Sequence, residues 1–101
     1  MNTDITALPG EEFVRQGLTD LAEGTDSVAS LLVQIGASRI REAGVSVPIF
    51  QPHDSAAELR LYDLLASEHG RGAYGQYNAL LRRLISFERA LEARHSRHMA
   101  A

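Results

Sequence analysis

The sequence has 101 residues, of which 45% are hydrophobic and 23% are charged, with a formal net charge of −3 and no cysteine. These proportions are typical of a single globular domain and argue against wholesale disorder. The lack of cysteine excludes disulfide bonds and cysteine-ligated metal sites. The first residues do not resemble a secretory leader, and the most apolar run, 28–33, is far shorter than the roughly 20 residues of a membrane span. We therefore expect a soluble, cytoplasmic protein that does not associate with a membrane.

The charges are distributed unevenly along the chain. Residues 1–38 carry six acids and one arginine, whereas residues 71–101 carry six arginines and two glutamates. Acidic early helices and a basic last helix can pair with each other inside one chain, with each surface pair contributing little. This intramolecular pairing is the favoured interpretation of the gradient.

In chain order, residues 1–9 are expected to form a flexible tail, of which Ile5 and Leu8 could dock on the helices, residues 10–98 one helical domain, and residues 99–101 a disordered end. The apolar spacing after Gly10 predicts a first helix that ends near Gly24. A second helix, capped by Thr25 or Asp26, is apolar around more than half of its circumference and ends at Gly44. Such a helix lies at the centre of a fold or against a second subunit.

The segment after the second helix contains Pro48 and Pro52, which prevent a continuous helix, so we expect an extended connector. Ser55 and Glu58 match a capping box that begins a third helix, and a long last helix follows from about 73 to about 95. The predicted fold is therefore all-α: a four-helix bundle-like domain with an extended Pro-containing connector between helices 2 and 3 and a long C-terminal helix.

Residues 70–75 match the pattern G-x-G-x-x-G. A dinucleotide fingerprint requires a strand before the loop, and here a helix precedes it, so dinucleotide binding is excluded. A weaker hypothesis is an anion-binding site formed by Arg71, Gly72, Arg82 and Arg83 near the start of the last helix. The commoner alternative is that the glycines only end one helix and begin the next.

The histidines invite a metal hypothesis, because Glu88 and Glu92 precede His95 and His98 on the last helix. Their spacing resembles half of a carboxylate-bridged di-iron site, which needs a second Glu-x-x-His on another helix. The sequence has no second copy of that motif, so we expect no metal and no cofactor.

Arg89 and His95 have the spacing R-x5-H, which resembles the R-x4-6-H motif of HEPN-type ribonucleases over seven residues. The resemblance implies that these two side chains would act on an RNA phosphate. The sequence has no other catalytic motif, so a non-enzymatic protein is favoured and a weak HEPN-like ribonuclease is an alternative. A second alternative is a nucleic-acid-associated protein that uses the Arg-rich last helix, with Tyr74 and Tyr77 stacking on bases.

The favoured function is a small protein-interaction module of unknown pathway that self-associates, with a homodimer as the favoured oligomer. The wide apolar surface of the second helix and the last helix, about 35 Å long for 23 residues, support association. A different protein partner and nucleic acid are the alternative partners. Five residues are expected to divide between the core and a subunit contact: Leu32, Val33, Leu81, Ile85 and Phe87.

Overall fold

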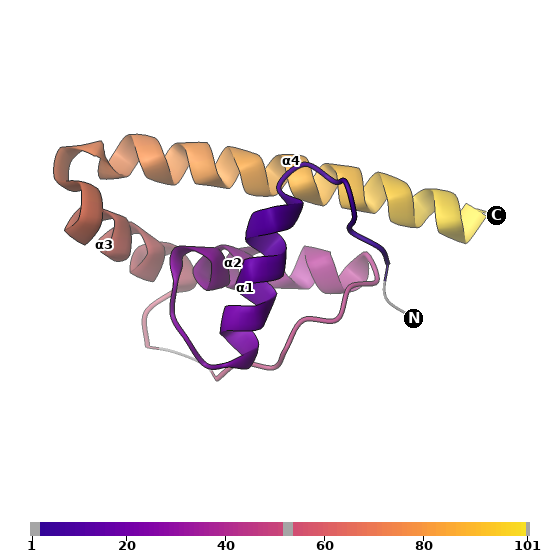
Figure 1. The fold of residues 1–101 in the computed structure, drawn as a ribbon, viewed down its shortest axis with the longest axis horizontal. Coiled ribbons are helices and arrows are strands. Elements are labelled where there is room, and N and C mark those ends of the chain that lie inside the picture. The colour runs from indigo at the N-terminus through magenta and orange to yellow at the C-terminus, as the bar shows by residue number, and fades with distance from the viewer. Residues whose placement is uncertain (1–2, 52–53, 101) are drawn as a thin grey trace.

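The computed structural model describes residues 3–51 and 54–100. Within these ranges the chain is helical and without strands, in the order α1 (Glu11–Ala22), α2 (Val28–Glu42), α3 (Ala57–His69), the one-turn 3-10 helix η1 (Gly70–Gly72) and α4 (Ala73–Ala100). The predicted helical class is confirmed. The four-helix bundle is not, because α1 lies across the other helices instead of alongside them (Figure 1).

α3 and α4 form a hairpin, since the chain turns back at η1 (Figure 1). Gly70 makes this turn in the left-handed region, with φ of 56°, where a glycine has no steric penalty. α4 continues to Ala100, past the predicted end near 95 and into the segment expected to be disordered. Its last turns extend beyond the other helices (Figure 1). None of the helices in the described ranges is long and apolar enough to cross a membrane.

The segment before α1 packs against the helices, although the sequence predicts a flexible tail there. Ile5 and Leu8 are buried in the core. The backbone N–H of Thr3 donates to the carbonyl oxygen of Gly44 at 2.8 Å, and Arg94 of α4 donates to two carbonyl oxygens of the segment. Residues 3–9 are therefore part of the packed domain. Residues 1 and 2, which belong to the predicted tail, lie outside the described ranges.

Two predicted helix starts differ from the observed ones. α2 is capped by Ser27, whose hydroxyl accepts the N–H of Ser30 at 3.1 Å, while the Ser30 hydroxyl accepts the N–H of Ser27 at 2.8 Å. Asp26 is not the cap, because its carboxylate pairs with Arg60 of α3. α3 begins after Ala56, an N-cap residue without a polar side chain, instead of at the predicted capping box.

The core consists of two clusters that meet at α2. The first joins the N-terminal segment, α1 and the connector to Phe87 and Leu91 of α4, and α2 contributes Val33 and Ile40. The second joins α2 to the α3–α4 hairpin through Leu31, Leu32, Leu61, Leu65, Ala73 and Leu84. The wide apolar surface of α2 is therefore used inside the chain. Leu32, Val33 and Phe87, predicted to divide between core and subunit contact, are 0–1% exposed and belong to the core.

α1 packs closely against α2 at Gly17. A Cβ atom there would lie 2.4 Å from the carbonyl oxygen of Ala29 and 2.5 Å from a methyl carbon of Val33. The backbone oxygen cannot rotate away, so α1 would have to move. We expect Gly17→Ala to lower the free energy of unfolding by about 1–3 kcal/mol, despite the higher helix propensity of alanine.

Urea denaturation followed by circular dichroism measures this change. Gly75→Ala in α4 is the matched control, because a Cβ there meets no described atom within 4 Å. It should stabilise the protein by about 0.5–1 kcal/mol. Equal effects of the two substitutions would show that close packing at Gly17 is not what excludes a side chain.

Candidate functional site

The outer surface of the α3–α4 hairpin carries exposed apolar side chains. On α3, Leu59 is 62% and Tyr62 is 37% exposed, while on α4 Tyr74 is 66% and Ile85 is 41% exposed. Single exposed apolar residues are ordinary on a protein surface, whereas a connected group indicates a contact surface. Whether these four residues indicate a contact surface therefore depends on whether they lie next to one another.

Helical spacing places them in two rows. Tyr74, Leu81 and Ile85 are separated by seven and four residues and lie along one side of α4. Leu59 and Tyr62 are three residues apart on α3. The rings of Tyr62 and Tyr77 meet edge to face with centroids 5.6 Å apart, which joins the two rows. We call the surface formed by Leu59, Tyr62, Tyr74, Tyr77, Leu81 and Ile85 the α3–α4 face.

Of the five residues predicted for core or subunit contact, Leu81 and Ile85 lie on this face. Leu81 is half-buried and Ile85 is exposed. The sequence does not predict a subunit contact for Leu59, Tyr62 or Tyr74; for Tyr74 it suggests only stacking on bases in the nucleic-acid alternative. The available signal was the broad apolar arc of the third helix, which is wider than a helix packed on one side requires.

The arginines of α4 do not pair with the acidic first helix. Arg83 lies over the ring of Phe13, 5.3 Å from its centroid, and Arg94 donates to backbone carbonyls. Arg82 and Arg89 are exposed, and neither forms an ion pair with another residue in the described ranges. The favoured intramolecular pairing of the charge gradient is therefore wrong for Arg82, Arg83 and Arg89. Arg94 follows it in part, because it lies beside the N-terminal segment, where hydrogen bonds from Thr6 and, to a lesser extent, the charge of Arg94 lower the pKa of Asp4.

Among the described residues, an ion-pair network of three side chains joins α2 to two glutamates of α4. Arg39 Nη1 lies 2.9 Å from Glu88 Oε1, and the same guanidinium binds both carboxylate oxygens of Glu92 at 2.7 and 2.9 Å. Burial raises the pKa of Glu88, and Arg39 opposes that shift. The hydrogen bonds from Arg39 lower the pKa of Glu92. This network fixes how α2 sits against α4, next to the α3–α4 face.

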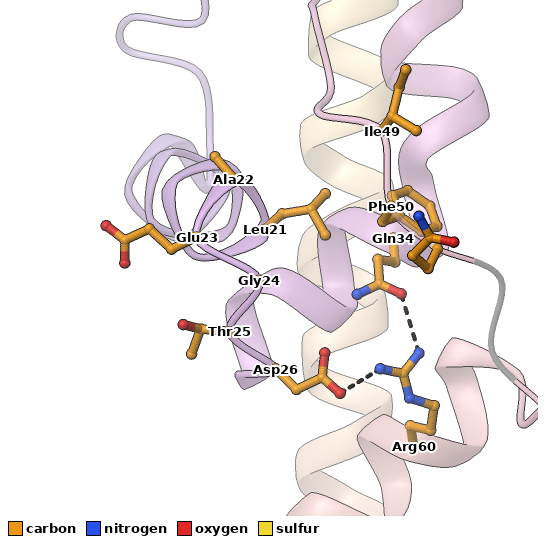
Figure 2. Close-up of a pocket in the computed structure, with 11 residues that line it drawn as sticks. Leu21, Ala22, Glu23, Gly24, Thr25, Asp26, Gln34, Ile49, Phe50 and Arg60 are labelled. Atoms are coloured by element: carbon orange, nitrogen blue, oxygen red, sulfur yellow. Dashed lines mark hydrogen bonds and ion pairs between the residues drawn. The ribbon is translucent and has the colours of Figure 1, made fainter.

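A pocket of about 620 Å³ lies between the α1–α2 corner and the connector. Figure 2 shows Arg60 pointing toward Asp26 and Gln34, with Leu21 and Phe50 on the opposite wall. The Arg60 guanidinium donates to both Asp26 and Gln34. These polar groups satisfy one another, and Glu23 points away from the pocket (Figure 2). Among the described lining residues, none therefore directs an unpaired charged group at a ligand.

The structure does not bring the predicted anion-binding residues together. Arg71 and Gly72 lie in η1, while Arg82 and Arg83 follow about 15 Å further along α4, at 1.5 Å per residue. Arg83 is also turned toward α1. The four residues therefore do not surround a common point.

The predicted catalytic pair is also separated. Arg89 is exposed, and His95 lies about 9 Å further along the helix axis, with its Nδ1 3.3 Å from the Thr3 hydroxyl. The 120° between their directions on the helix turns them apart. The described residues also contain no group of three or more His, Asp or Glu side chains arranged to hold a metal ion.

Comparison with known proteins adds no relative to these observations. No family model matches the sequence, and neither a curated protein nor a solved structure is detectably similar to it. The α3–α4 face is therefore interpreted from its own geometry and chemistry.

Proposed function

We propose that this protein is a helical interaction module that forms a homodimer through the α3–α4 face. The observation that supports this proposal is the row of exposed Leu59, Tyr62, Tyr74 and Ile85 across both helices of one hairpin. Covering this row removes apolar area from water, at about 25 cal/mol per Å². Aromatic side chains are also enriched at the centres of protein interfaces.

The distribution of charge supports a protein partner over a nucleic acid. Arg82 and Arg89 stand one turn from Ile85, at the edge of the face, while its centre is apolar. An apolar centre with a charged rim is the usual anatomy of a protein–protein interface. A nucleic-acid surface instead places its arginines where they follow the phosphate backbone. The alternative reading of α4 as an RNA-binding helix is therefore less well supported.

The proposal predicts a concentration-dependent dimer. Light scattering coupled to size exclusion should give about twice the 11.0 kDa chain mass at micromolar concentration. Ile85→Asn should weaken the dimer by at least about tenfold, because the apolar contact of Ile85 is lost and a polar amide is placed in the apolar centre of the face. Ser86→Asn is the matched control, since Ser86 is exposed on another side of the same turn and the substitution should leave the dimer intact.

Circular dichroism should show the same helix content in both variants. A wild-type protein that stays monomeric at micromolar concentration would contradict the proposal. A monomer that binds single-stranded RNA at low salt, with binding lost in Arg82→Ala, would replace it by the nucleic-acid alternative.

A further inference from the structure

We infer that α3 of one copy lies against α4 of the second copy, so that two hairpins form an intermolecular four-helix bundle. This inference rests on the proposed self-association, and concerns which helices meet. The α3–α4 face is nearly uniform in its apolar chemistry, so its apolar residues do not select one pairing. The charges beside it do.

The exposed charges of α3 beside the face are acidic. Glu58 is four residues from Tyr62, and Asp63 is four residues from Leu59, so each acid adjoins an apolar residue of the face. The one arginine of α3, Arg60, is turned away: its side chain is 15% exposed and pairs with Asp26. α3 therefore presents negative charge to a partner.

The exposed charges of α4 beside the face are basic. Arg82 precedes Ile85 by three residues, and Arg89 follows it by four. The two glutamates that follow on this helix are held by Arg39, which neutralises much of their charge. α4 therefore presents positive charge along the half of the helix that carries the face.

A two-fold dimer can pair these helices in two ways. If α4 meets α4 of the second copy, Arg82 and Arg89 face the same arginines, and the α3 acids face acids. If α3 meets α4, each acidic edge faces a basic edge at both symmetry-related contacts. Like charges in contact disfavour an interface, whereas complementary edges set its orientation. The charge pattern therefore selects the α3–α4 pairing.

Helix direction agrees with this choice. α3 and α4 run antiparallel within the hairpin (Figure 1). A two-fold axis parallel to the helices keeps the two copies of α4 parallel and sets each α3 antiparallel to the α4 of the second copy. Every neighbouring pair in the assembly is then antiparallel, as in an up-down four-helix bundle. The bundle that the single chain lacks would form between two chains.

Charge reversal tests this arrangement, with dimer dissociation measured by sedimentation equilibrium on the full chain. Arg82→Glu with Arg89→Glu should weaken the dimer by at least about tenfold, because acids would then face acids. Glu58→Arg with Asp63→Arg should do the same with arginines. The chain with all four substitutions should dimerise within about threefold of wild type, because the edges are complementary again.

The outcomes separate this inference from the proposed function. A wild-type monomer refutes the dimer itself. A wild-type dimer that neither double variant weakens overturns the inference, because acidic and basic edges that face each other cannot be reversed on one side without loss. Double variants that weaken the dimer without rescue by the fourfold variant also overturn the inference. Thermal unfolding of each variant verifies that the monomer remains folded.

Discussion

Replacing Phe87 by alanine is expected to lower the free energy of unfolding by about 3–5 kcal/mol. Phe87 is fully buried, and its ring meets that of Phe13 edge to face with centroids 6.3 Å apart. The substitution removes this contact between α4 and α1 and leaves a cavity that the surrounding helices cannot fill completely. Urea denaturation measures the loss.

Tyr74→Ala is the control for this substitution. Tyr74 is also an aromatic residue of α4, but it is exposed in the single chain. At concentrations where the protein is monomeric, its removal should change the free energy of unfolding by no more than about 0.5 kcal/mol. The reverse pattern, a stable Phe87→Ala chain that fails to dimerise, would place Phe87 in a subunit contact instead of the core.

Replacing Arg39 by methionine is expected to lower the free energy of unfolding at neutral pH. The substitution leaves the Glu88 side chain, 5% exposed, without its counter-ion. A buried charge without a partner destabilises the folded chain. The loss is smaller than for a fully buried pair, because the Arg39 side chain is itself 43% exposed and water reaches part of the network.

This loss should depend on pH in a defined direction. Burial raises the pKa of Glu88 above that of a carboxyl in the unfolded chain, and Arg39 holds the shift in check. Without Arg39 the pKa rises further, and the folded chain favours the protonated carboxyl. The variant is therefore least destabilised below the unfolded pKa of about 4.3, and the deficit grows as pH rises through the folded pKa.

Denaturation of wild type and Arg39→Met across about pH 4 to 8 measures this dependence. Adding Glu88→Gln to the variant removes the buried charge while keeping the shape of the side chain. The double variant should recover part of the loss at neutral pH and show a weaker pH dependence. The remaining dependence comes from Glu92, whose pKa Arg39 no longer lowers. A deficit of equal size at every pH would show that Arg39 acts through packing alone.

The sequence predicts the helices well, because apolar spacing and glycines determine them locally. Gly24, Gly44 and Gly70 all have positive φ at or beside helix ends, as expected for residues that stop a helix. The caps were harder to predict. Asp26 is a good capping residue in isolation, yet the fold brings Arg60 to it from 34 residues away. A local rule cannot include a partner supplied by tertiary packing.

The contact surface could be predicted only in part for the same reason. The apolar circumference of α2 indicates either a central helix or a subunit contact, and only the packing of two clusters on its sides decides for the centre. For α3, in contrast, part of the apolar arc stays outside the core. Leu59 and Tyr62 widen that arc, but the hairpin covers only its inner side, so both remain exposed.

The two core clusters are joined by α2, which contributes residues to both, and by Phe13 of α1, which packs against both. Loss of packing in one cluster therefore removes contacts that stabilise the other. Partial unfolding, in which one half of a domain opens while the rest persists, requires a boundary that few contacts cross. Because α2 contributes residues to both clusters, many contacts cross from one cluster to the other. The folded chain should therefore unfold as one cooperative unit, and a destabilising substitution in either cluster should lower the stability of the whole domain.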